Sequence, residues 1–372
     1  MLDDATKGFL VFLLLAVGLF PSWNPVSPPL WLGFAGDLMA PPEIQTQDPG
    51  LLYAGAEPWL RQDQLNFINV ETSVDPSLPL SDYPAFNAHT SYVLAAIRAG
   101  FNVFNLANNH ANDYGWKSVR ATLTSFQSLQ AQAQIAFSGL RQNPQGPFLG
   151  AVIEKDGWRI GFLSMTSLVN QPIGEKGVNF LPYHPLWDDR DDETVRRAAL
   201  AQVRAFRRSV DWLVVGLHDG KEYDTQLFPW QKRFYDALAK AGADVVWVQH
   251  PHVLRPWWVV KTSRGRSLVL SSMGNFVSGQ TRTLGPEEGG TPRADTGDSC
   301  LFRIRLVYRN GRLEFDALRP VLLTQAYDAS GAERIVPTQK WAAEGPLLWR
   351  GYFQDRLEHQ RAWARSGRDH GE

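Results

Sequence analysis

Cysteine and net charge are the two things that this chain has least of. Its 372 residues include one cysteine, Cys300, which excludes an internal disulfide framework and a thiolate metal cluster. The formal net charge is -1, so the sequence carries no broad basic surface for nucleic acid. Hydrophobic residues make up 44% and charged residues 20%, which is typical of a folded globular protein and excludes a disordered chain. A polyanionic substrate would therefore have to be met by local cations or metals.

Long apolar runs are also scarce, and the clearest one stands at the N-terminus. Gly8 to Phe20 reads GFLVFLLLAVGLF, with Lys7 directly before it. The run is shorter than the roughly 20 residues that span a bilayer comfortably, and its length matches the apolar region of a secretory signal. We expect residues 1–24 to be an uncleaved signal anchor or a signal peptide, and residues 25–29 to be a Pro-rich linker. The prediction is a single-pass protein of the cell membrane whose folded part is extracytoplasmic.

Apolar strands and amphipathic helices alternate along the rest of the chain. The predicted strands are 30–36, 66–69, 101–106, 211–217 and 244–248, and the predicted helices are 90–99, 116–132, 191–208 and 228–241. Asp156-Gly157, Arg264-Gly265 and Asn310-Gly311 predict three hairpin turns. This order favours an α/β fold with mixed sheets over residues 30–325, followed by a helical extension and polar tail over 326–372. Residues 282–297, rich in Gly, Pro and acids, are expected to form a mobile loop near the site.

Polar side chains follow five of the apolar runs. They are Asp37, Glu71, Asn109 with His110, His218, and His250 with His252. In open α/β sheets the carboxyl ends of strands meet at one edge, and ligands bind there. Carboxylates, an amide oxygen and neutral imidazoles form the ligand set of Mn, Fe or Zn in a dinuclear hydrolase. We therefore predict two divalent metal ions, which would hold a bridging hydroxide and stabilise charge on the attacked oxygen.

Taken singly, most of these residues have a simpler interpretation. Asp37 would be a turn residue, Glu71 a charge at a helix N-terminus, His218 a structural histidine, and Asn108-Asn109-His110 a turn. His250-Pro251-His252 is more specific, because proline favours an extended backbone and residues i and i+2 of such a segment point to the same side. The order and spacing of all the elements together favour the metal site.

Several segments resemble the CapA family of poly-γ-glutamate capsule proteins. LWLGFAGDLMA looks like the family's opening strand, NVETS like its Asn-x-Glu motif, and AGFNVFNLANNHANDYG is similar to its LANNH-x-x-DYG segment nearly residue for residue. LHDGKEY resembles the family's HWG-x-EY motif, HPHVLRP its HPHV-x-QP motif, and SMGNF its SLGNF motif. The resemblance covers about residues 30–276.

This resemblance implies a calcineurin-like metallophosphatase fold, a four-layer α/β/β/α sandwich of two mixed sheets. It also implies metal-ligand roles for Asp37, Glu71, Asn109, His218, His250 and His252. His110 would be the acid or transition-state donor, and Asp113 would orient His110 or hold its loop. Glu222 and Asn275 match motif residues, and Arg255, which replaces a glutamine, would offer a cation to an anionic substrate. These three are the candidate substrate-binding residues.

Three functions remain open at this level. The first is an anchored metal-dependent hydrolase or transferase that acts outside the membrane on poly-γ-glutamate or a related anionic polymer, at a phosphoester or an amide bond. The second is a non-catalytic accessory subunit of a membrane polymer synthase. The third is an intracellular phosphodiesterase with a hydrophobic N-terminal helix. We favour the first interpretation.

Overall fold

The computed structural model describes residues 29–172, 175–183, 193–309 and 311–369. The predicted anchor, residues 25–28 of the predicted linker, and the first residues of the helix predicted at 191–208 lie outside this part. Among the described residues, none of the helices combines the length and the apolar character that a membrane crossing needs.

The first sheet is mixed, as the sequence predicts. Its strands are β1 Leu30–Leu38, β2 Leu65–Val70, β5 Val103–Asn105, β6 Ala136–Ser138, β13 Asn275–Val277, β14 Asp298–Arg309, β15 Arg312–Tyr327 and β16 Glu333–Pro337. Within the described residues their order is β16-β15-β14-β1-β2-β5-β6, and β13 pairs with β1. β1, β2, β5 and β6 are parallel, whereas β14, β15 and β16 pair antiparallel.

The second sheet is mixed as well. Its strands are β7 Ala151–Lys155, β8 Trp158–Thr166, β9 Trp212–His218, β10 Val245–Gln249, β11 Trp257–Thr262, β12 Gly265–Leu270 and β17 Arg368–Asp369. Their order is β17-β11-β12-β10-β9-β8-β7, with β8, β9, β10 and β12 parallel. A separate small pair is formed by β3 Ser73–Val74 and β4 Asn87–Ala88.

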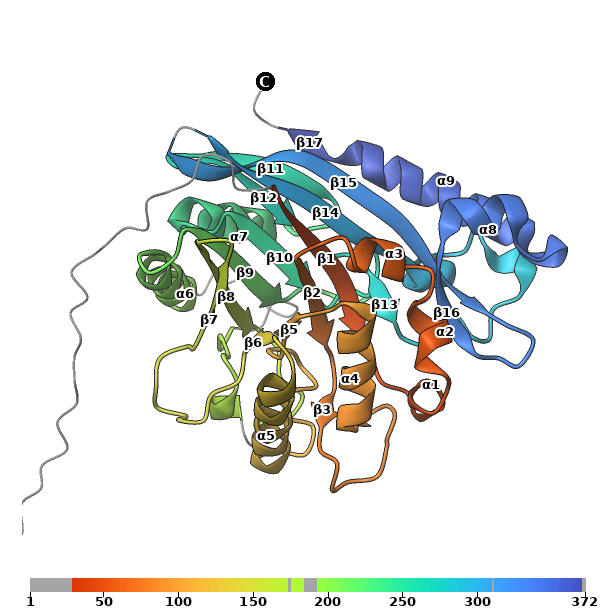
Figure 1. The fold of residues 1–372 in the computed structure, drawn as a ribbon, viewed down its shortest axis with the longest axis horizontal. Coiled ribbons are helices and arrows are strands. Elements are labelled where there is room, and N and C mark those ends of the chain that lie inside the picture. The colour runs from red at the N-terminus through yellow and green to blue at the C-terminus, as the bar shows by residue number, and fades with distance from the viewer. Residues whose placement is uncertain (1–28, 173–174, 184–192, 310, 370–372) are drawn as a thin grey trace, which may run out of the picture.

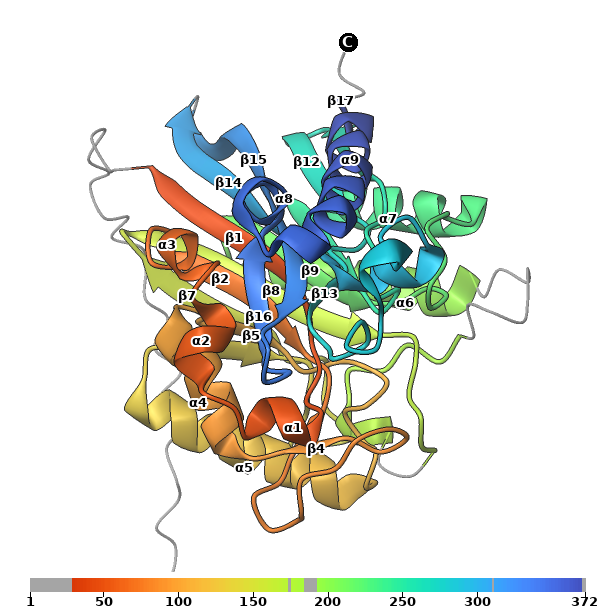
Figure 2. The same cartoon turned by 90° about the vertical axis from the view of Figure 1, so that its right-hand side faces the viewer.

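Helices cover the outer faces of both sheets and one side of the core between them. They are α1 Pro42–Gln45, α2 Pro49–Tyr53, α3 Glu57–Leu60, α4 Thr90–Ala99, α5 Trp116–Gln132, α6 Glu193–Arg207, α7 Pro229–Ala241, α8 Thr338–Glu344 and α9 Arg350–Ser366. Short 3₁₀ helices occur at Glu175–Gly177, Pro286–Glu288, Pro292–Gly297 and Leu347–Trp349. Figure 2 shows α4 and α5 on one side of the strands and α6 and α7 on the other.

Three buried apolar clusters hold these layers together. One joins α1 to α5 to the first sheet, and another joins α6 and α7 to the second sheet. Between the sheets, Phe34 and Phe67 pack against Phe162 and Trp247. Each such side chain stabilises the fold by about 1.5–3 kcal/mol relative to an exposed position. The predicted α/β/β/α sandwich of two mixed sheets is therefore confirmed.

Local signals fixed several element boundaries. The predicted helices 90–99 and 116–132 coincide with α4 and α5. Gly100 and Gly242 follow α4 and α7 with φ of 121° and 129°, a conformation that glycine adopts without strain. Asp156 and Gly157 form the predicted hairpin turn, where Lys155 pairs with Trp158. The segment 282–297, expected as a mobile loop, forms two of the 3₁₀ helices.

The C-terminal segment is part of the sandwich rather than a peripheral tail. The domain boundary predicted after residue 325 falls inside β15, and β16 continues the same sheet. Helix α9 packs along β15, as Figure 1 shows, and its Trp363 is buried in the cluster between the two sheets. The Trp363 indole donates a hydrogen bond to the Arg255 carbonyl oxygen at 2.7 Å. Helix α9 therefore closes one side of the inter-sheet core.

Candidate metal centre

Two carboxylates from neighbouring strands form the middle of the site. Asp37 lies within β1, opposite Asn69 of β2, where the pairing register of β1 is irregular. Glu71 follows β2 directly, and its backbone N–H donates to the Leu38 carbonyl oxygen. Both carboxylates are fully buried. Asn69 Nδ2 donates to Asp37 Oδ1 at 2.8 Å and lies 3.5 Å from Glu71 Oε2, so one amide positions both acids.

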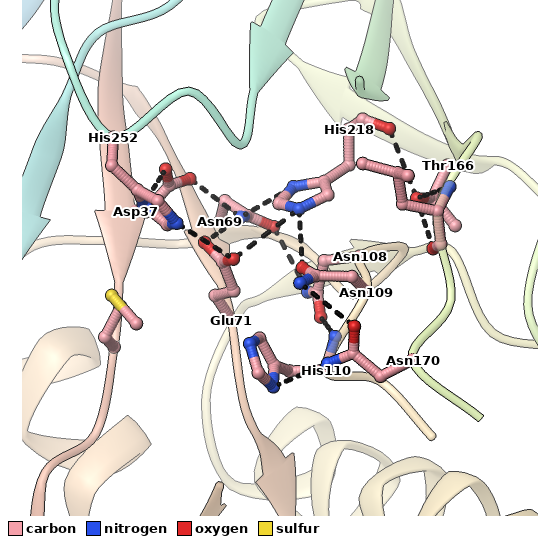
Figure 3. A network of polar contacts seen from close by, with 12 residues as sticks. Asp37, Asn69, Glu71, Asn108, Asn109, His110, Thr166, Asn170, His218 and His252 are labelled. Carbon is pink, nitrogen blue, oxygen red and sulfur yellow. Dashed lines mark hydrogen bonds and ion pairs between the residues drawn. The ribbon is translucent and has the colours of Figure 1, made fainter. Parts of the chain in front are cut away.

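Histidines from the second sheet face these carboxylates. His218 is the last residue of β9, and its Nε2 lies 3.5 Å from Glu71 Oε1. His252 Nδ1 lies 3.3 Å from Asp37 Oδ2, and its Nε2 lies 3.7 Å from Glu71 Oε1. Ring centroids are 4.8 Å apart for His218 and His250, and 5.8 Å apart for His250 and His252. Side chains from both sheets therefore converge in this cluster, part of which Figure 3 shows from close by.

The backbone around Pro251 differs from the prediction. An extended segment was expected, but β10 ends at Gln249, and His250 and His252 have positive φ values of 105° and 59°. Non-glycine residues avoid this region, and such strain persists where the surrounding structure imposes it. The Asp219 N–H donates to the Gln249 carbonyl oxygen, and the Tyr223 N–H donates to that of Pro251. The imidazoles converge through a tight turn, and the prediction of an extended pair is wrong.

All six residues predicted as ligands lie together. Glu71, His250 and His252 present ligand atoms within 4.8 Å of one another, and so do Asp37, Glu71 and His218. Glu71 belongs to both groups. Asn109 Oδ1 lies 2.8 Å from His218 Nε2, which adds the amide oxygen to the second group. Two overlapping groups that share one carboxylate are an arrangement able to hold a pair of cations.

The electrostatics of the cluster favour added positive charge. Burial and the neighbouring His250 lower the pKa of His218 well below its usual value, and burial and His252 do the same for His250. Burial and the charge of Asp37 raise the pKa of Glu71. Burial alone would lower the pKa of His252, but Glu71 and Asp37 outweigh it and raise that pKa to about 10. The carboxylates thus attract a cation, while two imidazoles remain neutral, as ligands must be.

Several candidate ligand atoms of the cluster have no hydrogen-bond partner. Asp37 Oδ2, Glu71 Oε1 and His250 Nδ1 are buried without one. Among the described residues, neither Asp37 nor Glu71 forms an ion pair with a lysine or arginine. Asp37 Oδ2 and Glu71 Oε1 lie only near imidazole nitrogens, at 3.3–3.7 Å, and the burial of such oxygens costs free energy that a divalent cation would offset. The residues present therefore fit divalent metal ions.

His110 lies beside the ligands and is held from two directions. Its Nδ1 lies 2.7 Å from Asp113 Oδ2, and its ring packs edge-on against Phe86 at a centroid distance of 4.6 Å. Asp113 Oδ2 also accepts the Phe86 backbone N–H at 2.8 Å, and Asn170 Nδ2 donates to Asp113 Oδ1 at 3.2 Å. The Asp113 carboxylate therefore makes both predicted kinds of contact, one with the His110 imidazole and one with the loop backbone.

The three residues predicted to bind substrate have three different environments. Glu222 is exposed and lines a cleft beside the cluster. Asn275 is buried, and its Oδ1 lies 2.9 Å from His252 Nδ1 while its Nδ2 donates to the Thr296 carbonyl oxygen at 3.0 Å. This orientation makes Asn275 an acceptor from Nδ1 and leaves His252 Nε2 for a metal.

The predicted role of Arg255 as a cation for the substrate is wrong. Arg255 is 0% exposed, and its guanidinium donates to the carbonyl oxygens of Asp224 and Lys221. It therefore supports the loop after β9 and offers no cation to a substrate. The sequence identified the charge but gave no indication of its burial.

The cleft has a volume of about 410 Å³ and opens beside His110 and His252. A second cavity of about 390 Å³ shares Tyr223 and Gln280 with it and contains Arg293. Gln280 Nε2 donates to the Tyr223 hydroxyl at 3.3 Å, and Gln280 Oε1 accepts from Asn275 Nδ2 at 2.9 Å. A chain of hydrogen bonds thus runs from His252 through Asn275 and Gln280 to the cleft surface.

Sequence reasoning missed five residues of this region: Asn69, Asn170, Tyr223, Gln280 and Arg293. Asn69 is the first residue of the Asn-x-Glu motif, so the motif itself carried a signal for it. Arg293 lies in the segment 282–297 that was expected near the site. Asn170 and Gln280 lie outside the motifs and enter the site only through tertiary contacts.

Known proteins resemble this chain over part of its length. A family model described as "Bacterial capsule synthesis protein PGA_cap" matches residues 31–280, a range that contains all six candidate ligands. "Capsule biosynthesis protein CapA" of Bacillus anthracis is 31% identical over 230 residues, which are 61% of this chain and 50% of that protein. "PGA biosynthesis protein CapA" of Bacillus subtilis (strain 168) is 30% identical over 186 residues, which are 49% and 44%. The chain spans about half the length of the curated relatives it matches.

Solved structures overlap with it less closely. A putative 5'-nucleotidase from Staphylococcus aureus, in complex with alpha-ketoglutarate, gives a TM-score of 0.47 at 13% identity, over 82% of this chain and 57% of that one. The calcineurin-like phosphoesterase YfkN from Bacillus subtilis gives 0.44 at 11% identity, over 91% and 99%. Overlaps of this size say nothing about individual site residues.

Proposed function

The chain belongs to the bacterial capsule synthesis protein family PGA_cap, and we propose that it is a metal-dependent hydrolase or transferase of capsule-polymer synthesis. Its substrate would be poly-γ-glutamate or a related anionic polymer, and the bond a phosphoester or a γ-glutamyl amide. The printed names of the two relatives support a capsule polymer. We further propose that the N-terminal apolar run anchors it in the membrane, with the folded part outside.

One observation carries the enzymatic part of this proposal. Two carboxylates and three imidazoles from both sheets converge in a buried cluster, and Asp37 Oδ2 and Glu71 Oε1 have no hydrogen-bond partner there. A scaffold protein has no need to bury such atoms, because apolar residues would fill the space at lower cost. The cluster also opens onto a cleft, as a catalytic site requires.

The candidate ligands are Asp37, Glu71, Asn109, His218, His250 and His252. Divalent cations held there would supply positive charge to the electrophile and lower the pKa of water. Asn69 and Asn275 orient Asp37 and His252 for this binding. The buried position of the cluster limits access of bulk water to it.

His110 is suited to deliver a proton to the leaving group. Asp113 accepts from Nδ1, which leaves Nε2 as the nitrogen available to the cleft that His110 lines. Asp113 and Phe86 fix the plane of the ring, so the proton stays at a defined position. Asp113 is therefore a positioning residue for His110.

An anionic polymer needs a cation near the cleft, and we propose Arg293 for this role. It lines the adjoining cavity, and its guanidinium donates to the Thr283 hydroxyl. Arg293 takes the part that the sequence assigned to Arg255.

The test combines metal content with turnover. The purified protein, loaded with Mn²⁺, is expected to hydrolyse bis-p-nitrophenyl phosphate or γ-glutamyl-p-nitroanilide. Asn109→Ala and His252→Ala should each lower kcat by at least about a hundredfold, because both remove a metal ligand. Asn143→Ala, the same change on an exposed loop, is the matched control and should keep wild-type activity. Equal activity in all four proteins would remove the assignment.

The accessory-subunit interpretation predicts a different result. A protein that purifies without metal, and that Mn²⁺ or Zn²⁺ does not stabilise against heat, would be a scaffold rather than an enzyme. The anchoring proposal is tested separately by fractionation of cells that express the full chain or a chain without residues 1–24. Recovery of the full chain in the soluble cytosolic fraction would contradict it.

A further inference from the structure

The cleft beside the metal centre has an unusual charge for a protein that handles polyanions. Three carboxylates, Glu43, Asp82 and Glu222, line it, and its described lining includes no lysine or arginine. Glu43 is paired with Arg282 at 2.9 Å. Asp82 and Glu222 form no ion pair among the described residues. His110 and the candidate ligand His252 line the same cleft, but a carboxylate placed beside Asp82 and Glu222 would face their two negative charges, which disfavours it there.

Aromatic rings supply the rest of the outer wall. The Tyr83 side chain is 80% exposed and that of Tyr223 is 55% exposed, although both are large and partly apolar. Phe86 lines the cleft as well. Isolated exposed aromatic residues are ordinary, but here they border the same cavity as the carboxylates. Carboxylates beside aromatic faces are the combination that recognises an ammonium group.

Tyr223 is held in place by the site itself. Its φ is 60°, a conformation that costs energy for a residue with a side chain. Its N–H donates to the Pro251 carbonyl oxygen at 2.9 Å, and its hydroxyl accepts from Gln280 at 3.3 Å. Its ring centroid lies 5.8 Å from that of His252. The strained backbone thus fixes an exposed ring against a candidate metal ligand, on the wall of the cleft.

We propose that this cleft binds a primary ammonium group of the substrate, next to the bond that is acted on. Glu222 and Asp82 would accept its N–H hydrogens, and Tyr223 and Tyr83 would offer their faces to its charge. The statement that the ammonium belongs to the substrate rests on the proposed function. According to this proposal, the part of the substrate that enters the cleft bears an amine. The anionic part of the polymer would lie near Arg293.

Binding of two matched probes to the Mn²⁺-loaded full chain tests this proposal without any need for turnover. Nα-acetyl-lysine amide carries the ammonium, and Nα-acetyl-norleucine amide has the same side chain without it. Calorimetric or NMR titration should give about tenfold tighter binding of the lysine probe, the size expected for an ammonium at aromatic and acidic groups. Equal affinity of the two probes would overturn the proposal.

Variants locate the binding. Glu222→Gln and Tyr223→Asn should each weaken the lysine probe several-fold, and asparagine is chosen because it tolerates a positive φ. Glu154→Gln, the same charge change on β7, is the control and should bind as wild type. Unchanged binding in Glu222→Gln, or displacement of the lysine probe by Nα-acetyl-γ-glutamyl-glutamate, which carries carboxylates but no ammonium, would contradict an ammonium site.

The two proposals fail separately. Selective lysine binding without hydrolysis of any test substrate would remove the enzymatic function and leave the ammonium site standing. Hydrolysis without a preference for the lysine probe would keep the enzyme and remove this inference. Choline, which has no N–H donor, distinguishes the source: binding weaker than that of the lysine probe supports a primary amine, and tighter binding contradicts it.

Discussion

Two clusters of acids and histidines occur among the described residues, and only one has the character of a metal site. The first is the metal-centre cluster described above, and the second consists of Asp295, Asp298 and His359. Both groups place possible ligand atoms within 4.8 Å of one another. The distances between possible ligand atoms therefore do not distinguish the two clusters.

The difference between them is the source of positive charge. In the second cluster, Arg356 of α9 is 2% exposed and donates to both oxygens of Asp298 and to Asp295. Gln360 adds a bond to Asp298 at 2.7 Å. In the metal-centre cluster no arginine or lysine of the described chain takes this place. A constellation of acids and histidines is thus a metal candidate only where no arginine or lysine of the protein supplies the counter-charge.

The largest expected effect comes from removal of that internal counter-charge. Arg356→Met leaves Asp298 buried without a cation and should lower the free energy of unfolding by about 3–5 kcal/mol, as for other broken buried pairs. Arg361→Met, on the exposed side of the same helix, is the control and should cost little. Urea denaturation measures both. Similar losses in the two variants would mean that Arg356 does not compensate the cluster.

Glu333 represents a third arrangement, a buried acid held by neutral donors. Tyr327 and the backbone N–H groups of Ser278 and Gly279 donate to it, and burial raises its pKa from 4.5 to about 7. Between those values the folded state binds more protons than the unfolded one, so stability falls as pH rises from about 4.5 to about 7. The loss is up to about 3 kcal/mol, at about 1.4 kcal/mol per pKa unit.

This pH effect is isolated by comparison with Glu333→Gln. The difference in unfolding free energy between wild type and variant should move in the variant's favour from pH 5 to pH 8. Other acids contribute equally to both proteins and cancel. A difference that is constant over this range would show that Glu333 ionises at its ordinary pKa.

Metal binding should separate the two clusters directly. At a Mn²⁺ concentration of about 100 times Kd, the wild type should gain about 2.7 kcal/mol of stability. Glu71→Gln should lose this gain, because Glu71 belongs to both ligand groups, whereas Asp295→Asn should keep it. Thermal unfolding with and without Mn²⁺ or a chelator gives the comparison. If Asp295→Asn lost the stabilisation by Mn²⁺, the metal would bind in the cluster of Asp295, Asp298 and His359, against the prediction.

The smallest effect is expected at His359. Its side chain is 43% exposed and lies 3.1 Å from Asp298, where Arg356 already provides the charge. His359→Gln should therefore change stability by less than about 1 kcal/mol, as for other exposed ion pairs, and leave the response to Mn²⁺ unchanged. A weaker Mn²⁺ response would show that His359 takes part in metal binding.

Helices and hairpins were predictable because their signals are local. The bounds of α4 and α5 follow from apolar spacing and a glycine stop, and the turn at Asp156-Gly157 follows from two adjacent residues. Long-range pairing was not predictable in the same way. β15 extends to Tyr327 because β14 and β16 pair with it on either side, and its sequence gives no sign of this length.

The candidate site also has features that the sequence predicted and features that only long-range contacts determine. The order of Asp37, Glu71, Asn109, His218 and His252 after apolar runs was readable, since parallel strands bring their carboxyl ends to one edge. The positive φ of His250 and His252 was not, because hydrogen bonds from distant segments impose it. Arg255 and Arg293 had interchangeable charges in the sequence, and only burial separates them.

The sequence by itself determined which ligand chemistries are present and in what order they reach the sheet edge, since strand periodicity and motif spacing are properties of the chain. The tertiary structure decided where charge is left uncompensated. Whether a carboxylate contacts an arginine, a backbone N–H or only imidazoles depends on contacts between segments far apart in the chain, such as Asp298 and Arg356. Those contacts exist only in the packed fold, where burial makes a missing counter-charge costly.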